Sequence, residues 1–414
     1  MQIKDHVKSI RNSTFYTILL CSLFIALPSR AQQISYQGIV FQCEASQLEP
    51  IQQEMSAYFK ALKLEETWVN KRSFIGGIAY TLATPEKDSN TLTLRDQKKY
   101  AITTEKITLN NQPSAANYDK KQNVKHITTV SRKEILLALL QRGRSTQFIG
   151  KDCSVQRLQE HIGVRQHIVA WSQNLNWIWP NGGRAQWNTR YWNKGTPLPN
   201  ISPFTALRDS FLSQNKYAIG CFTAAKLVMA HAISDYYLHV KSDQARSTRI
   251  SERLLQDDEP LVNIEPGAMW YFESDFDSAE QLREGKLLTL IDEVAGDNFV
   301  PGDWAYFLNT DTASYAQTGY EGSNAIYLGN GRFADFYNDS NHSYTLKEKI
   351  DEVYQWRNGV FNRVRDQKKI QPLTENDYQK LLNTPKQGGL LLPYRATPIF
   401  FSEHTPRSLY QKSE

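Results

Sequence analysis

The stretch that most limits the fold of this chain is the apolar run from Asn215 to Ile233, NKYAIGCFTAAKLVMAHAI. Its composition predicts a buried helix that begins at Cys221, directly after Gly220. A thiol in the first turn of a helix lies beside unpaired backbone N–H groups and the positive end of the helix dipole, and both favour the thiolate. Cys221 is therefore the candidate nucleophile. The alternative is that Cys221 is a small apolar residue packed in the core.

The first 31 residues have the features of a secretory signal peptide. Three basic residues precede an apolar run from Phe15 to Leu27, and small residues follow it at Ser29 and Ala31. We therefore expect a secreted or periplasmic protein with no transmembrane anchor after cleavage. Removal of residues 1–31 takes away four basic and one acidic side chain and lowers the formal net charge from +5 to +2. A net charge this close to zero gives no indication that the protein binds nucleic acid.

Signal cleavage also changes the number of cysteines. Cys21 is removed, and Cys43, Cys153 and Cys221 remain, which is an odd number in an oxidising compartment. We expect a disulfide between Cys43 and Cys153 that leaves Cys221 free, although spacing alone does not fix the connectivity.

The rest of the chain predicts an α+β protein with more than one domain. Residues 32–130 contain strand-like runs and one helical pattern from Leu48 to Leu64, which favours a small N-terminal α/β domain of unknown role. A capping box formed by Ser131 and Glu134 opens the next helix, and another helix follows from Ser154. We assign residues 131–366 to a catalytic domain and residues 367–414 to a C-terminal extension.

Five of the nine tryptophans lie between Trp171 and Trp192. They either build an aromatic core or line a groove for substrate, and packing is the preferred interpretation. The acidic region from Asp257 to Glu293 has neither EF-hand spacing nor a histidine-glutamate motif, so we expect no metal site and no cofactor.

Four segments carry a family resemblance: GCFTAA around Cys221, PGDWAYF at 301–307, GSNAIYLGNGRFADF at 322–336 and IDEVYQWRNG at 350–359. Together they resemble the protein-glutamine γ-glutamyltransferases of spore-forming bacteria, which are calcium-independent transglutaminases built on an NlpC/P60-like, papain-like core. The resemblance covers about residues 197–366. It implies a nucleophile-bearing helix packed on an antiparallel sheet. It also implies attack by Cys221 on the carboxamide of a protein glutamine, with the acyl group passing to a lysine amine or to water.

The resemblance places Cys221 on the nucleophile of the family, but its partners differ. Gly220 stands where that family has an acidic residue, Ser323 stands at the essential glutamate, and the family histidine falls near Asp335. Serine cannot act as a general base at neutral pH without an activator.

Several residues remain as partners for the thiol. Asp335 is the preferred ionisable partner, with polar support from Asn324 or Ser323, while Glu321 and His342 are further candidates. A two-residue loop at Asn330-Gly331 would place Asn324 and Asp335 on one face of the hairpin, whereas a three-residue loop or a bulge would place Ser323 and Asp335 together. Trp304 and Tyr217 are expected to contact substrate.

Two other functions stay open at this point. One is a thiol amidase or endopeptidase that acts on cell-wall peptides, with water as the acceptor. The other is a catalytically inactive binding protein of the same fold, which Ser323 in place of an acid supports.

Overall fold

A computed structural model of the chain describes residues 36–85, 88–110, 124–255, 288–292, 297–339, 341–361, 368–391 and 394–398. The predicted signal peptide lies outside the described residues, as does the end of the predicted C-terminal extension. All described residues belong to one compact unit that starts at residue 35. The unit combines helices with two main sheets, as the predicted α+β class requires. Among its helices, none is long and apolar enough to cross a membrane.

The first sheet has four strands in the order β2-β3-β1-β6, and β1 pairs in parallel only with β6. Helix α1 packs on it through Ile51, Met55 and Phe59. Strand β6 comes from beyond residue 130, in the segment assigned to the catalytic domain. The bounds are β1 (Gly38–Gln42), α1 (Ala45–Ala61), β2 (Val69–Phe74), β3 (Gly77–Leu82) and β6 (Ser145–Ile149).

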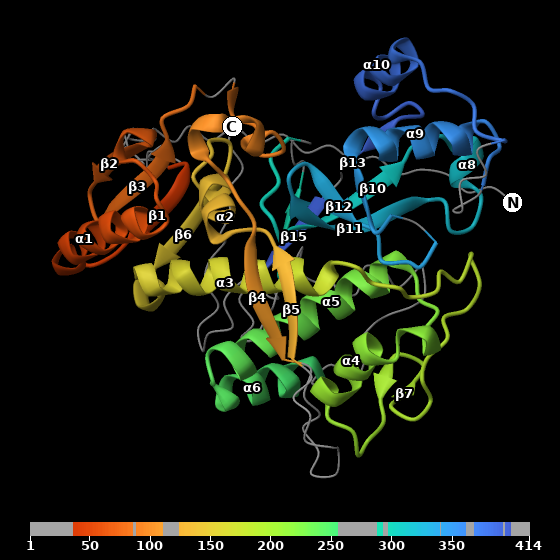
Figure 1. The fold of residues 1–414 in the computed structure, drawn as a ribbon, viewed down its shortest axis with the longest axis horizontal. Helices are drawn as coiled ribbons and strands as arrows, with labels where there is room; N and C mark the ends of the chain where they lie inside the picture. The colour runs from red at the N-terminus through yellow and green to blue at the C-terminus, as the bar shows by residue number, and fades with distance from the viewer. Residues whose placement is uncertain are drawn as a thin grey trace, which may run out of the picture. The chain divides into compact units, whose positions relative to one another are not determined.

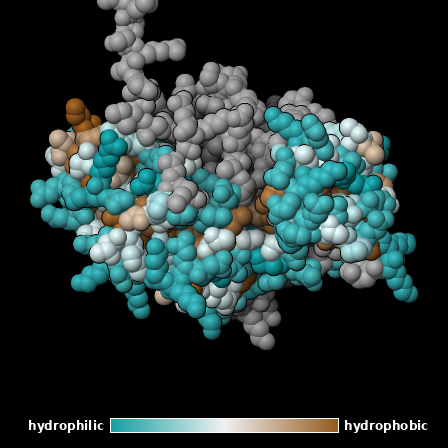
Figure 2. All heavy atoms as spheres, turned by 90° about the horizontal axis from the view of Figure 1, so that it is seen from above, coloured by the Kyte–Doolittle hydropathy of each residue, from teal (hydrophilic) through white to brown (hydrophobic). Residues whose placement is uncertain are grey.

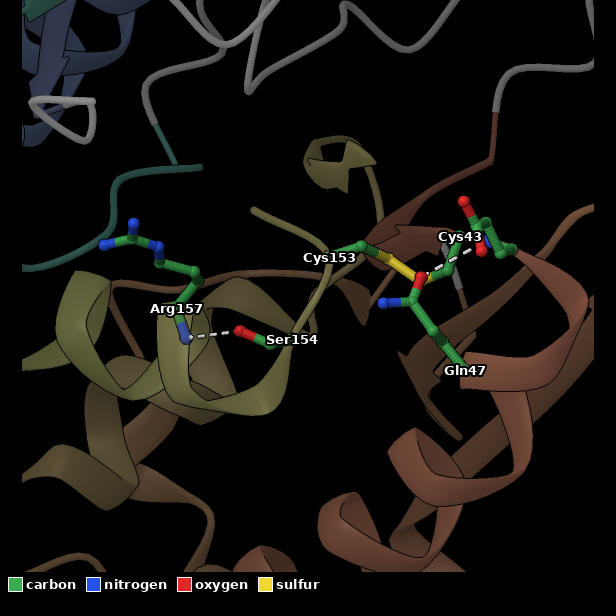
Figure 3. Close-up of a disulfide and its surroundings, with 6 residues drawn as sticks. Cys43, Gln47, Cys153, Ser154 and Arg157 are labelled. Carbon is green, nitrogen blue, oxygen red and sulfur yellow. Dashed lines mark hydrogen bonds between the residues drawn. A yellow bond between two sulfur atoms is a disulfide. The ribbon is translucent and has the colours of Figure 1, made fainter. Parts of the chain in front are cut away.

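A disulfide joins this sheet to the helix that follows β6. Cys43, just after β1, is bonded to Cys153, just before α3 (Val155–Ser172), and the two Cα atoms lie 5.7 Å apart. Figure 3 shows the bond between the start of α1 and the start of α3, where the Ser154 side chain accepts the backbone N–H of Arg157. The bridge closes a long segment of chain, since its ends are 110 residues apart.

The second sheet carries the segments of the family resemblance. Its order is β13-β12-β11-β10-β15-β9, with β14 also pairing with β10, and every pairing in it is antiparallel. The predicted hairpin is formed by β11 and β12, with Asn330 and Gly331 at its turn, where both have positive φ. The bounds are β9 (Leu288–Asp292), β10 (Trp304–Asn309), β11 (Gly322–Gly329), β12 (Arg332–Ala334), β13 (Ser343–Thr345), β14 (Leu390–Leu391) and β15 (Tyr394–Pro398).

Two long helices pack beside this sheet. Helix α5 (Cys221–Asp235) contacts both α3 and β11, and Figure 1 shows α3 and α5 side by side. Residues 222–235 are all buried, which explains the continuous apolar run in the sequence. The remaining elements are β4 (Glu105–Asn110), β5 (Val124–Thr129), α2 (Arg132–Leu139), β7 (Trp192–Asn193), β8 (Thr196–Pro197), α4 (Pro203–Leu212), α6 (Gln244–Leu255), α8 (Thr312–Tyr315), α9 (Leu346–Arg357) and α10 (Glu375–Asn383).

The tryptophan-rich segment packs into the core around α5. Trp171, Trp177 and Trp192 are buried, and Trp179 and Trp187 are partly buried against the same cluster. The preferred interpretation of this segment, packing, is confirmed for Trp171, Trp177 and Trp192. On the face shown in Figure 2, hydrophilic side chains predominate and hydrophobic surface occurs only in small areas.

Candidate active site

Cys221 is the first residue of α5, as the sequence predicts. Gly220 is the N-cap, and its carbonyl accepts the first helical hydrogen bond from the N–H of Ala224 at 2.9 Å. The thiol is half-buried and free, while every later residue of the helix is buried. Because Cys221 begins a buried helix, its sulfur is held in a fixed position, while one side of the residue remains accessible to solvent.

Asn324 on β11 provides two hydrogen bonds to the sulfur. Its backbone N–H lies 3.3 Å from Cys221 Sγ, and its side-chain Nδ2 lies 3.5 Å away. N–H donors directed at a sulfur stabilise its negative form more than its neutral form. The two donors therefore make this the most defined contact of the candidate nucleophile.

The orientation of the Asn324 amide is set by a neighbouring strand. Trp304 Nε1 donates to Asn324 Oδ1 at 2.9 Å, which directs Nδ2 towards the sulfur. Register explains the contact: Trp304 pairs with Ile326 and Tyr306 pairs with Asn324, so Trp304 and Asn324 are diagonal neighbours on one face. Both side chains are buried, so the acceptor cannot turn to water instead.

The hairpin contains the bulge that places Asp335 on the Ser323 side. Tyr327 pairs with Phe333 and Gly329 with Arg332, which shifts the register by one residue. Continuation of the first pairing sets Asp335 opposite Ala325, on the face of Ser323 and not that of Asn324. The backbone N–H of Asp335 donates to the carbonyl of His342 at 2.9 Å, beside the start of β13.

A second group of polar side chains lies around Ser323. Lys349 Nζ of α9 donates to Ser323 Oγ at 3.4 Å and forms an ion pair with Glu352. The hydroxyl of Tyr344 on β13 lies 3.5 Å from Ser323 Oγ, and Lys349 Nζ lies 4.2 Å from the Tyr344 ring centroid. Sequence reasoning missed Tyr344, Lys349 and Glu352, because lysine and glutamate three residues apart on a helix usually mark a solvated face.

The pKa of Tyr344 shows which charges surround it. Burial raises that pKa well above 10, the hydrogen bond with Ser323 opposes the rise, and the negative forms of Asp335, Glu352 and Cys221 add to it. The phenol therefore stays protonated at neutral pH. Asp335, Glu352 and Cys221 all lie within electrostatic range of this one hydroxyl.

A narrow pocket adjoins the sulfur. Its volume is about 20 Å³, room for about one water molecule. A Cβ on Gly322 would lie 2.4 Å from the carbonyl oxygen of Phe307, so glycine is required there. The lining residues are Trp179, Cys221, Gly319, Tyr320, Gly322, Ser323, Tyr337, Lys349 and Trp356. Tryptophan from the sequence-predicted cluster thus reaches the pocket through Trp179.

The other predicted site residues lie elsewhere. Tyr217 is fully buried and donates to Asp209 Oδ2 at 2.6 Å, and Trp304 is buried against Asn324. These two side chains contact the protein interior and do not line the pocket, which corrects their expected role in substrate contact. The Glu321 carboxylate accepts the backbone N–H of Gly319 at 2.9 Å and so closes the turn before β11. Within the described parts of the chain, no cluster of three or more His, Cys, Asp or Glu side chains is placed to hold a metal ion.

Comparison with known proteins identifies a family for the chain. A family model described as protein-glutamine gamma-glutamyltransferase matches residues 107–359, which include Cys221, Asn324 and Glu352. Protein-glutamine gamma-glutamyltransferases of Bacillus mycoides (strain KBAB4) and Bacillus cereus (strain G9842) are each 27% identical over 172 residues. The matched segment makes up 40% of this chain and 49% of each relative, so the chain spans about half the length of the curated relatives it matches.

A solved structure is also similar: a transglutaminase from Geobacillus stearothermophilus without its C-terminal extension, at 19% identity and a TM-score of 0.36. The match covers 59% of this chain and 93% of that one. Because the family model spans more than half of the sequence, the chain belongs to the protein-glutamine gamma-glutamyltransferase family.

Proposed function

We propose that this protein transfers the acyl group of a protein glutamine through a thioester on Cys221. The thiolate of Cys221 attacks the carboxamide carbon, ammonia leaves, and a lysine ε-amine or water then takes the acyl group. The observation that carries the proposal is the pair of Asn324 N–H donors on the Cys221 sulfur, inside the segment that the family model matches.

Other parts of the site fit this chemistry. The backbone N–H of Cys221, at the N-terminus of α5, is a donor for the oxyanion that forms during attack. Asn324 contacts the reacting sulfur directly, and its two N–H groups stabilise the thiolate. We include in the proposal an NlpC/P60-like core within residues 131–366 and a secreted or periplasmic location. Residues 32–130 form an N-terminal α/β part whose sheet is completed by β6 of that core.

The test uses the purified protein with a glutamine-containing peptide and a fluorescent primary amine. We expect ammonia release, amine incorporation into the peptide, and an intact-mass adduct on Cys221 when amine is omitted. Cys221→Ala abolishes all three. Ammonia release without amine incorporation would instead indicate a hydrolase. An unreactive wild-type protein that forms no adduct would refute the proposal and favour a binding role.

A further inference from the structure

Acyl transfer needs a group that gives a proton and later takes one back. The leaving ammonia must be protonated as the C–N bond breaks, and the incoming amine must lose a proton as the new bond forms. The residue at the position of the family glutamate is Ser323, whose hydroxyl does neither at neutral pH without an activator. The chemistry of this site therefore requires an ionisable group other than Ser323.

Lys349 is such a group, and it lies in the pocket of Cys221. Its side chain lines the same narrow cavity as the sulfur, and its Nζ donates to Ser323 Oγ. Ser323 directly precedes Asn324, whose two N–H groups contact the sulfur. The ammonium is thus connected to Cys221 through two consecutive residues of β11 as well as through the pocket.

Burial makes the charge of Lys349 unusual. The Lys349 side chain is 2% exposed and that of its partner Glu352 is 10% exposed. Lys347 of the same helix, α9, forms an ordinary surface pair with Glu375 of α10, and these side chains are 61% and 65% exposed. A buried ion pair is often no more stable than apolar side chains of the same volume, so stability alone does not account for the inner pair.

We propose that Lys349 is the general acid and base of this site, with Glu352 holding it in place; the inference rests on the proposed acyl transfer. In acylation the Cys221 thiolate bonds to the carboxamide carbon, the C–N bond breaks, and the Lys349 ammonium gives its proton to the leaving ammonia. In deacylation a neutral amine, or water, bonds to the thioester carbon and gives its proton to the now neutral Lys349. The C–S bond then breaks, and the thiolate and the ammonium are both restored.

Other ionisable groups lie near the site. Besides burial, the charges of Asp335 and Glu352 raise the pKa of Tyr344, and Lys226 of α5 lies over the Phe222 ring with Nζ 4.9 Å from its centroid. Lys349 is the cation that lines the pocket itself. Its charge favours the thiolate, while Glu352 opposes that effect. Removal of each partner should therefore move the titration of Cys221 in opposite directions.

The first experiment measures the rate of Cys221 alkylation by iodoacetamide against pH in the full chain. Lys349→Met raises the midpoint by about one pH unit or more, since an adjacent opposite charge is lost. Glu352→Gln lowers the midpoint, and the surface control Lys347→Met leaves it unchanged. If Lys349→Met does not fold, the double variant Lys349→Met/Glu352→Met is used instead, because it removes both buried charges. Its alkylation midpoint should be higher than that of Glu352→Met alone. An unchanged midpoint in a folded protein that lacks Lys349 would overturn the proposal.

The second experiment separates charge from proton transfer by use of Lys349→Arg. Arginine keeps the positive charge but does not release a proton at neutral pH. We expect a wild-type alkylation midpoint together with a loss of about 100-fold or more in the turnover of a glutamine-containing peptide. Wild-type turnover in this variant would show a merely structural role for Lys349. If the wild-type protein forms no thioester, the proposed acyl transfer is refuted. The alkylation profiles then still show whether the charge of Lys349 promotes ionisation of the Cys221 thiol.

Discussion

The hydrogen bond from Trp304 to Asn324 makes a quantitative prediction about the site. Trp304→Phe keeps an aromatic ring in the core but removes the N–H that fixes the Asn324 amide. The lost bond leaves the buried Oδ1 without its donor, at a cost of about 1–3 kcal/mol. If that cost falls on the oriented amide in the transition state, kcat/KM drops about 5- to 150-fold.

The matched control is another buried tryptophan of the same core. Trp192 is also fully buried, and its Nε1 donates to the carbonyl of Ala206 at 3.2 Å. Trp192→Phe should lower the free energy of unfolding by a similar amount and leave kcat/KM unchanged. Both variants are measured by urea denaturation and by ammonia release from a glutamine-containing peptide. Equal losses of activity in the two variants, or none in Trp304→Phe, would refute the role of Trp304 in orienting Asn324.

Three further predictions concern stability. His231 is buried against Phe211 and Trp171, and burial lowers its pKa to about 4, below the ordinary 6.5. As the pH falls, His231 is protonated in the unfolded chain before it is protonated in the folded one. Its contribution to the free energy of unfolding is therefore complete above about pH 6.5 and is lost as the pH falls towards 4. From pH 7 to 5 the loss is about 2 kcal/mol, and urea denaturation of His231→Phe should show a smaller loss than wild type over that range. Asp303→Asn leaves Arg165 and Arg144 without the carboxylate that lies 2.8 and 3.5 Å from them, and we expect a loss of about 3–5 kcal/mol in unfolding free energy, with no loss as the contradicting result. Replacement of Cys43 and Cys153 by alanine opens a bridge between residues 110 apart, which should cost about 5 kcal/mol in denaturant titrations and leave iodoacetamide labelling of Cys221 unchanged.

The sequence predicts those parts of the site that depend on local patterns. Glycine before a cysteine and a long apolar run locate the start of α5 at Cys221. Asn330-Gly331 between two strand-like runs locates the hairpin turn, because both residues accept positive φ. In each case neighbouring residues decide the conformation, so a short window of sequence is sufficient.

The polar group around Lys349 could not be predicted in this way. Lys349 and Glu352 are neighbours on α9, and the same spacing describes the exposed faces of many helices. Their burial depends on the packing of α9 against Tyr344, just before the helix, and against Ser323 of β11, which is 26 residues before Lys349. The sequence therefore predicts the ionisable partner of Cys221 on the hairpin, whereas in the structure a lysine of α9 lies beside Ser323.

The register of the hairpin shows how one residue can have both a local and a distant role. Ser131 accepts the backbone N–H of Glu134, as the predicted capping box requires, but the Glu134 carboxylate does not complete the box. It binds Arg95 at 2.7 Å and accepts the backbone N–H of Asn330 at 2.9 Å, and a Cβ on Gly329 would lie 2.5 Å from its Oε1. Glu134 of α2 therefore holds the turn at the bulge that shifts the register. Because that shift places Asp335 on the Ser323 face, Glu134 in the first turn of α2 influences which side chains surround the Tyr344 hydroxyl, although it is distant from Cys221 in sequence.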